Sequence, residues 1–323
     1  MAIGRCAAVA CTLLFVAGCR VGSVTVNPGQ WRGWEARVLR NPVAEVVVVP
    51  GIGRVMQFRL LDGREPSGAF WSHPALGPAL APDENGWINF GGDKAWPAPQ
   101  KDWERAAGRG WPPPATFDAV AHAASVEGDA IVLTSPVDAA YGIRVRRKIA
   151  LHPSKAEMSI ETTYEKVQGA PVRIAVWTIT QLASPRVMTV ALPERSAFAG
   201  GFRGLLPAPP KNLSVQGREL TIERDTEAKT MIATDGDRLT WRGEEPEPLV
   251  VTVENQTPAQ PGSVWPDGIH SQIYTSPDGA QAYVELELLG PLHDLAPGES
   301  AALTSRYTLA RERVVLVGKA ADR

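Results

Sequence analysis

Apolar and polar residues alternate one by one over much of the chain, most clearly after residue 117. A period of two places successive side chains on opposite faces of a β-strand. Glycine and proline turns separate the alternating runs. The pattern predicts strands at 45–50, 54–61, 117–126, 129–134, 141–151, 156–167, 171–182, 219–223, 228–233, 238–242, 248–254, 269–275, 281–289 and 299–309.

The same pattern argues against a helical protein. No segment repeats apolar residues every three or four positions over three helical turns. Many short strands with turns about every ten residues are typical of an all-β sandwich or barrel. Neither an internal repeat nor a linker divides the chain, so we predict a single β-sandwich domain over 31–323, preceded by a tether at 19–30.

The first residues have the pattern of a targeting signal. Arg5 precedes an uncharged apolar run at 6–18, which is too short to cross a bilayer as a helix. The run ends in Val16-Ala-Gly-Cys19, and small residues before a cysteine resemble a bacterial lipoprotein signal. We therefore predict a signal peptide at 1–18, a lipid on Cys19 and a membrane partner through that anchor. The alternatives are an ordinary secretory signal or a buried apolar segment.

Arg20 follows the predicted lipidated cysteine. An aspartate there would resemble an inner-membrane retention signal, so the expected location is the cell envelope, at the outer membrane and facing the periplasm.

Composition narrows the possible chemistry. All three cysteines lie within the first 19 residues, which leaves the rest of the chain without a disulfide or a cysteine metal site. The 33 basic and 35 acidic residues give a net charge of −2, which predicts no nucleic-acid partner. The five histidines lack ligand spacing, and neither a phosphate loop nor a dinucleotide fingerprint is present. We expect no metal and no cofactor.

A tryptophan- and proline-rich insert at 66–115 is the most unusual segment. It holds five of the ten tryptophans, namely Trp71, Trp87, Trp96, Trp103 and Trp111. Long irregular segments are usually functional or disordered, and tryptophan supplies enough apolar area to order a loop. The insert is therefore either a cap on one end of the sandwich or the wall of a carbohydrate pocket.

Residues 87–100 carry the pocket hypothesis. This stretch is a poor helix and a poor strand, so we expect a shaped loop. An indole can lie against the apolar face of a sugar ring, while charged and amide groups bind its hydroxyls. Candidate sugar-binding residues are Asp93, Lys94, Trp96 and Gln100, and the preceding Gly91-Gly92 pair would let the backbone approach a ligand closely.

Two later segments carry compatible chemistry. In 283–289, Val284, Leu286 and Leu288 face the core, and Glu285 and Glu287 share the other face about 6.5–7 Å apart. That separation suits a general acid–base pair, but it is also what a solvent-facing glutamate pair would show. In 171–182, Trp177 and Gln181 share a face.

Several runs together resemble a known fold family. They are Asn41-Pro42, Val46-Val-Val-Val-Pro-Gly-Ile-Gly-Arg54-Val-Met-Gln-Phe58, Gly91-Gly-Asp-Lys-Ala-Trp-Pro-Ala-Pro-Gln100, Tyr283-Val-Glu-Leu-Glu-Leu-Leu-Gly-Pro291 and Leu295-Ala-Pro-Gly-Glu-Ser300. From about Asn41 to about Ala310, the chain resembles a bacterial lipoprotein branch (domain of unknown function 4380) of the galactose mutarotase-like, or aldose 1-epimerase-like, superfamily.

The resemblance implies a large antiparallel β-supersandwich with a sugar site on its concave face. It implies that Glu285 is the general base, with Glu287 as the competing position. Arg54, which lies in one of the matching runs, is a further sugar-binding candidate, and Glu287 is another.

The sequence also departs from aldose 1-epimerases. Those enzymes carry a general-acid histidine in a strand whose counterpart here reads Trp177-Thr-Ile-Thr-Gln181, without histidine. His270 is the candidate replacement. The favoured function is therefore binding of a small or oligomeric saccharide, and this binding does not require turnover. The alternatives are an aldose 1-epimerase-like enzyme and a non-catalytic envelope scaffold that docks another protein through the insert.

Overall fold

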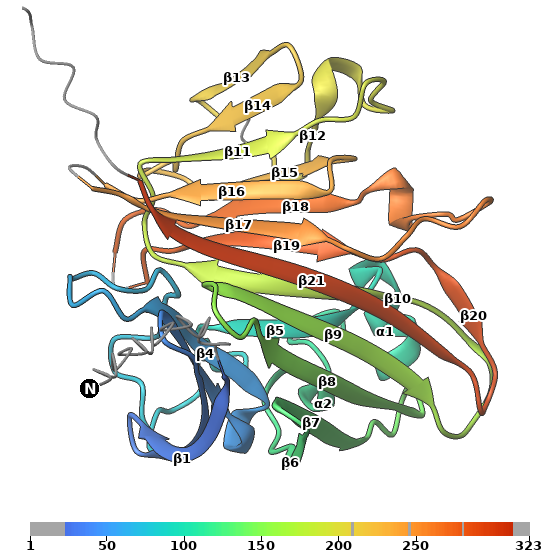
Figure 1. The fold of residues 1–323 in the computed structure, drawn as a ribbon. Helices are drawn as coiled ribbons and strands as arrows, with labels where there is room; N and C mark the ends of the chain where they lie inside the picture. The colour runs from blue at the N-terminus through green and yellow to red at the C-terminus, as the bar shows by residue number, and fades with distance from the viewer. Residues whose placement is uncertain (1–22, 208–209, 245–246, 280, 313–323) are drawn as a thin grey trace, which may run out of the picture.

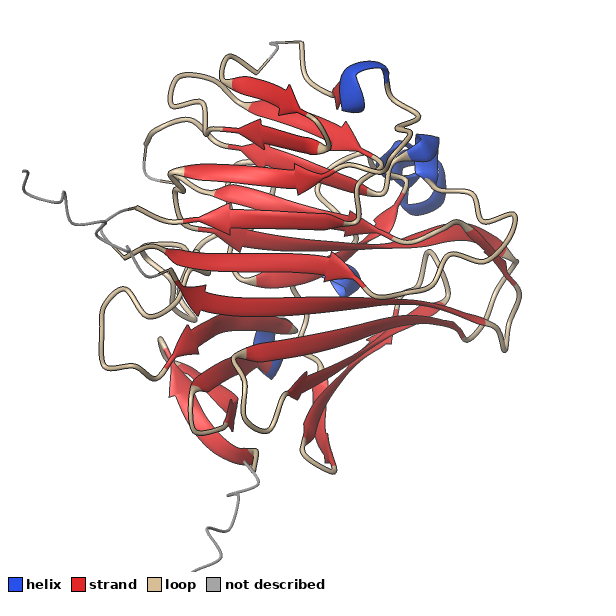
Figure 2. Ribbon diagram, turned by 45° about the horizontal axis from the view of Figure 1, so that its top comes forward, coloured by secondary structure: helices blue, strands red, loops and turns tan. Residues whose placement is uncertain are grey.

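The computed structural model describes residues 23–207, 210–244, 247–279 and 281–312, which form two large antiparallel sheets packed face to face (Figures 1 and 2). We name each sheet after its central strand. The β10 sheet runs β1 (Thr25–Trp31), β2 (Trp34–Arg40), β3 (Ala44–Val49), β4 (Arg54–Leu60), β5 (Asp93–Ala98), β10 (Val172–Leu182), β19 (Val284–Leu289), β18 (Ser271–Thr275), β15 (Thr230–Thr234) and β12 (Arg203–Gly204), and β20 (His293–Leu295) also pairs with β10.

The β21 sheet covers one face of the β10 sheet. It runs β13 (Leu213–Gln216), β14 (Glu219–Ile222), β11 (Val187–Ala191), β16 (Arg238–Arg242), β17 (Leu249–Asn255), β21 (Ser300–Arg311), β9 (Glu157–Lys166), β8 (Ile143–Leu151), β7 (Ala130–Val137) and β6 (Ala123–Glu127). The short helices are α1 (Trp103–Ala107) and α2 (Ala115–Asp118), with single 3₁₀ turns at Pro50–Ile52, Gln100–Asp102, Ala199–Gly201 and Pro266–Gly268.

The all-β prediction is confirmed, and most strands downstream of residue 129 lie where the alternation placed them. In β8 and β9, buried residues alternate with partly exposed ones, because only one face of this part of the β21 sheet packs on the core. The predicted strand at 117–126 is wrong in its first half. Residues 115–118 form α2, and β6 begins only at Ala123.

The central strands of the β10 sheet are buried on both faces. Every residue of β5 and β19 is buried, as are the last nine residues of β10. One face packs on the β21 sheet, and the tryptophan-rich insert and neighbouring loops cover much of the other. The expectation that 87–100 is a loop is therefore wrong for Asp93–Ala98. Asp93 and Lys94 place one charge on each face of this strand, so apolar and polar residues do not alternate along it.

The N-terminal part of the domain also begins earlier than predicted. Thr25–Trp31 form β1, which pairs along its whole length with β2, so the tether predicted at 19–30 is shorter than expected. Cys19 and the predicted signal peptide at 1–18 lie outside the described residues.

None of the helices in the described ranges is long and apolar enough to cross a membrane.

Asp93 joins the two sheets. It lies on β5 and is fully buried, and its carboxylate forms an ion pair with Arg147 of β8. The hydroxyls of Thr180 and Tyr307 donate hydrogen bonds to it at 2.7 and 2.6 Å. Because Arg147 and Tyr307 belong to the β21 sheet, Asp93 points between the sheets. The prediction that Asp93 binds a sugar is therefore wrong.

Replacing Asp93 with Asn is expected to lower the free energy of unfolding by about 3–5 kcal/mol, because the buried guanidinium of Arg147 loses its paired charge. Urea denaturation followed by tryptophan fluorescence measures the change. Asp294→Asn is the matched control, since Asp294 and Arg173 form an exposed ion pair, and it should change stability little. Equal stability of Asp93→Asn and the native protein would contradict this role.

Candidate functional site

The outer face of the β10 sheet gathers the polar side chains that the sequence placed far apart. In the sheet register, Trp96 lies opposite Trp177, Lys94 opposite Ile179, and Gln181 opposite Glu285. Glu287 lies opposite both Ile179 and Gln272. Since alternate residues of a strand point to the same side, Lys94, Trp96, Trp177, Gln181, Gln272, Glu285 and Glu287 all share this face.

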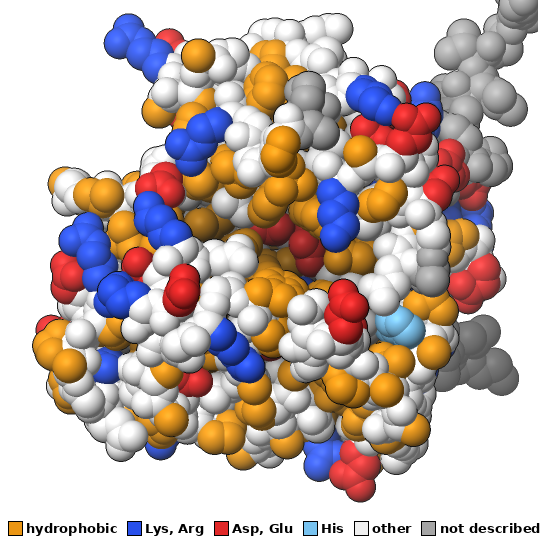
Figure 3. All heavy atoms as spheres, turned by 180° about the vertical axis from the view of Figure 1, so that it is seen from behind, with side chains coloured by type: hydrophobic (Ala, Val, Ile, Leu, Met, Phe, Trp, Pro, Cys, Tyr) orange, Lys and Arg blue, Asp and Glu red, His pale blue; other side chains and the backbone are white. Residues whose placement is uncertain are grey.

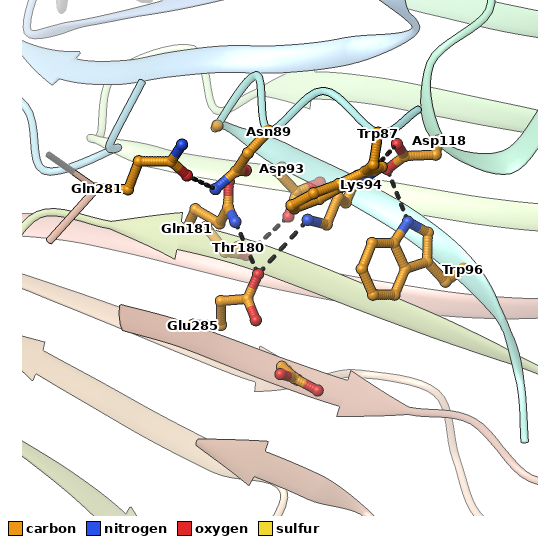
Figure 4. Close-up of polar contacts among 12 residues, drawn as sticks. Trp87, Asn89, Asp93, Lys94, Trp96, Asp118, Thr180, Gln181, Gln281 and Glu285 are labelled. Atoms are coloured by element: carbon orange, nitrogen blue, oxygen red, sulfur yellow. Dashed lines mark hydrogen bonds and ion pairs between the residues drawn. The ribbon is translucent and has the colours of Figure 1, made fainter. Parts of the chain in front are cut away.

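Glu285 lies at the centre of the group (Figure 4). The amide nitrogen of Gln181 donates a hydrogen bond to its Oε1 at 2.8 Å, and the Nζ atom of Lys94 lies 3.5 Å from the same oxygen. The Glu285 side chain is 11% exposed, whereas that of Lys94 is 1% exposed. The carboxylate is thus held from one side by buried donors and reaches solvent on the other.

Lys94 lies against two indole rings. Its Nζ is 4.3 Å from the ring centroid of Trp96 and 5.5 Å from that of Trp87. Burial lowers the pKa of Lys94, and the neighbouring charge of Glu285 opposes that shift. The two indole faces and the carboxylate together stabilise an ammonium group that is shielded from water.

Five tryptophans form a continuous wall beside Glu285. Trp96 makes edge-on ring contacts with Trp87, Trp103, Trp111 and Trp177, at centroid distances of 5.4 to 6.5 Å. Four of these residues come from the insert and the fifth from β10. The insert is therefore an ordered part of the site's enclosure.

Asp118 at the end of α2 positions this wall. Its carboxylate accepts hydrogen bonds from the indole nitrogens of Trp96 at 2.8 Å and Trp87 at 2.9 Å. Arg54 in turn binds Asp118 at 2.7 Å and the carbonyl of Gly91 at 2.8 Å. Arg54 is fully buried behind the wall. The prediction that Arg54 binds sugar is corrected, because its donors are used within the protein.

Gly91 and Gly92 serve the fold and not a ligand. Both have left-handed φ angles, of 90° and 71°. A Cβ atom on Gly91 would lie 2.3 Å from the carbonyl oxygen of Trp71, and one on Gly92 would lie 2.5 Å from that of Val55. The expected close approach therefore occurs between backbone segments of the protein itself, immediately before β5 begins.

Glu287 occupies a drier position than Glu285. It is 1% exposed, and the indole nitrogen of Trp177 donates a hydrogen bond to it at 2.8 Å. Burial raises the pKa of Glu287 well above its ordinary value, and the charge of Glu285 raises it further. The two carboxyl groups share a face, but the drier surroundings of Glu287 favour its protonated form.

A hollow opens beside these carboxyl groups. Figure 3 shows it from the side of the β10 sheet, with acidic side chains at its floor, hydrophobic side chains around them, and lysine and arginine on its rim. A cavity of about 300 Å³ on this face is bordered by Trp177, Gln272, Gln100, Lys101 and Arg203, and it lies next to the two glutamates, which are not among its lining residues. Gln100 is therefore placed where a ligand could reach it.

His270 does not join Glu285. Its Nδ1 lies 3.1 Å from the carboxylate of Asp237, and its ring stacks on Trp265 at 4.0 Å. His270 precedes β18 by one residue, four residues before Tyr274, which pairs with Glu285, and this separation is about 13 Å. The prediction of His270 as the catalytic partner of Glu285 is corrected.

The sequence reasoning missed several residues of the site. Asp118 fell inside a wrongly predicted strand, and Arg203 and Gln272 lay on short strands without a distinctive pattern. Trp87 belonged to the predicted insert, but nothing in the sequence indicated that its ring would contact Lys94. Within the described ranges, no group of three or more His, Cys, Asp or Glu side chains is placed to hold a metal ion.

Comparison with known structures identifies the fold. A galactose mutarotase-like protein from Lactobacillus casei superposes on 85% of this chain and 100% of its own length, with a TM-score of 0.59 and 11% sequence identity. This chain has a galactose mutarotase-like fold. The galactose mutarotase related enzyme from Lactobacillus acidophilus covers 88% of this chain and 97% of its own, with a TM-score of 0.52 and 9% identity. No protein-family model and no curated protein sequence matches the chain.

In this fold, the Glu285–Glu287 pair lies on the outer face of the β10 sheet, and the role of Glu285 as a general base stays a prediction. The assignment to a lipoprotein branch of the superfamily stays a prediction.

Replacing Glu287 with Gln is expected to flatten the pH dependence of stability. The unfolded chain has the ordinary glutamate pKa of about 4.3. As pH rises above that value, the folded protein still holds a proton that the unfolded chain has released, so the native free energy of unfolding falls. The fall amounts to about 1.4 kcal/mol for each pH unit between the two pKa values. Glutamine does not titrate, so the variant should not show this fall in the free energy of unfolding. Its carbonyl can still accept the hydrogen bond from Trp177.

Urea denaturation at several pH values from about 4 to about 8 measures the effect. Glu161→Gln, on the exposed side of β9, is the control and should follow the native profile. Parallel profiles for Glu287→Gln and the native protein would show that Glu287 is not held protonated.

Proposed function

We propose that this protein binds a saccharide in the hollow beside Glu285. The observation that carries the proposal is the convergence of an indole wall with a carboxylate, an ammonium and an amide on one concave face. A sugar ring offers an apolar C–H face and a rim of hydroxyls. Trp177 suits the first, while Glu285 and Gln181 suit the second through charge-assisted and amide hydrogen bonds.

Preorganisation supports binding at this site. Glu285 is held by Gln181 and Lys94, and the wall is held by Asp118 and Arg54. Side chains fixed in this way lose little conformational entropy when a ligand arrives. The cavity of about 300 Å³ lies at the lower end of the range for small-molecule sites.

The scaffold alternative has less support. A docking surface needs exposed apolar side chains, but Trp96 and Trp103 of the insert are buried and Trp71 and Trp87 are half-buried. Trp111 is 39% exposed, and it is the only tryptophan of the described ranges among the exposed large hydrophobic residues. The insert thus directs most of its aromatic area inward.

A lipid anchor on Cys19 remains part of the proposal. The signal pattern at 1–18 supports it, as does the position of Cys19 shortly before β1 begins at Thr25. Such an anchor would hold the sugar site close to a membrane surface, at the outer membrane facing the periplasm.

Glu285→Gln is expected to weaken saccharide binding about tenfold or more, because a charge-assisted hydrogen bond becomes a neutral one. Isothermal titration calorimetry against a panel of monosaccharides and oligosaccharides measures the affinity. Glu161→Gln is the matched control and should bind as the native protein does. Failure of every sugar to bind to folded native protein would overturn the proposal.

The glutamate pair favours epimerase-like catalysis as a second candidate. Opening an aldose ring requires a base that takes the anomeric hydroxyl proton and an acid that protonates the ring oxygen as the bond from the anomeric carbon breaks. Ring closure reverses both transfers. Glu285 is the more exposed carboxylate and suits the base. Glu287, in which burial favours the protonated form, is the neighbouring group that suits the acid in place of a histidine.

Polarimetry on freshly dissolved glucose and galactose tests this candidate. If the protein accelerates mutarotation, Glu285→Gln should reduce the rate about 100-fold or more, and Glu287→Gln should have a comparable effect. No acceleration by native protein that binds the same sugar would leave a binding function without turnover. A rate unchanged by both substitutions would remove the pair from the mechanism.

A further inference from the structure

A second cavity lies beyond Glu285, on the far side from the first. It has a volume of about 230 Å³ and is bordered by His73, Asp83, Trp87, Asn89 and Gln281. We call it the Asn89 cavity, and we call the first one the Gln272 cavity. Figure 4 shows Asn89 and Gln281 on the opposite side of Gln181 and Glu285 from Trp96. Trp87 borders the Asn89 cavity and also contacts Lys94, whose Nζ lies 3.5 Å from Glu285.

Three buried amide oxygens in the region from one cavity to the other have no hydrogen-bond partner. They are Oδ1 of Asn89, Oε1 of Gln181 and Oε1 of Gln272, in residues that are 5%, 0% and 7% exposed. Leaving a buried acceptor unsatisfied is costly, so native proteins usually pair such atoms. Gln272 borders the first cavity and Asn89 borders the second. Gln181 lies between them, beside Glu285.

The orientation of the Gln181 amide is fixed by its nitrogen, which donates to Glu285 at 2.8 Å. Turning this amide over would replace the donor by an oxygen at that contact and lose the bond. The Asn89 amide donates to Gln281 at 3.1 Å. In this arrangement the three oxygens are buried and unpaired, so each is an acceptor for a ligand hydroxyl group that enters beside it.

The distance between these amides is large for a single sugar ring. Gln181 and Gln272 lie on strands separated by β19 and are offset by two residues, which places their Cα atoms about 12 Å apart. Aromatic rings also lie on both sides of Glu285. Trp177 borders the Gln272 cavity. On the other side, the ring of Trp71 contacts that of Tyr283 in a tilted arrangement at a centroid distance of 4.8 Å, and Tyr283 contacts Tyr274, which pairs with Glu285.

We infer that the site takes an oligosaccharide of at least two linked sugar units, with one unit in the Gln272 cavity, another in the Asn89 cavity and the linkage region over Glu285. This inference rests on the proposed saccharide-binding function and specifies the class of ligand. A monosaccharide would satisfy one cavity and leave the other amide oxygen unpaired.

Calorimetry with glucose and galactose, and with cellobiose, maltose, lactose, cellotriose and maltotriose, tests the inference. At least one linked sugar should bind about tenfold or more tightly than its monosaccharide units, as expected for one additional hydrogen bond of ordinary strength. Asn89→Ala should abolish that gain, so that linked sugars bind no more tightly than their monosaccharide units. Asn212→Ala, at an exposed position, is the matched control.

Gln281→Ala provides a second variant, because Gln281 is exposed at the edge of the Asn89 cavity and its loss should not affect folding. It should reduce the gain for linked sugars in the same direction. Equal affinity for linked sugars and their units, or a gain that survives both substitutions, would overturn the inference while the proposed function stands. If no saccharide binds at all, both the proposed function and this inference fail.

Discussion

The buried charges on β5 determine how the rest of the site is arranged. Asp93 and Lys94 are adjacent in sequence and therefore point to opposite faces of the same strand. Asp93 binds Arg147 and Tyr307 of the other sheet, and Lys94 reaches Glu285 on the outer face. A slip of one residue in this strand would bury an unpaired charge on each face, so the core ion pair holds the register that presents Lys94 and Trp96 to the hollow.

The tryptophan-rich insert makes the outer face a suitable place for such charges. It covers β5, β10 and β19, which would otherwise present Lys94, Glu285 and Glu287 to water. In surroundings of low polarity, the attraction between Lys94 and Glu285 is stronger, and the ionisation of Glu287 is less favourable. The same wall supplies indole area next to the carboxylates. The insert thus produces the electrostatic differences within the site and also places indole rings next to the charged groups.

The position of His270 separates this site from the pattern expected for aldose 1-epimerases. Stacked on Trp265 and paired with Asp237, it lies four residues along β18 from the partner of Glu285. Proton transfer at Glu285 would have to rely on Glu287 or Lys94. Without a histidine beside Glu285, the site is better suited to the proposed binding of a saccharide than to its turnover.

The sequence by itself determined the fold class, most strands after residue 129 and the inward set Val284, Leu286 and Leu288, because apolar and polar residues alternate along those strands. It also indicated that Glu285 and Glu287 share a face, since that depends only on their spacing. Strand β5 could not be predicted, because its two charged residues lie on opposite faces and leave no alternation. The roles of Asp93, Arg54 and His270 were decided only by tertiary structure. Whether a polar side chain meets a ligand or another residue of the protein depends on what packs against its strand, and here the partners come from Arg147, Asp118 and Asp237, which are distant in sequence.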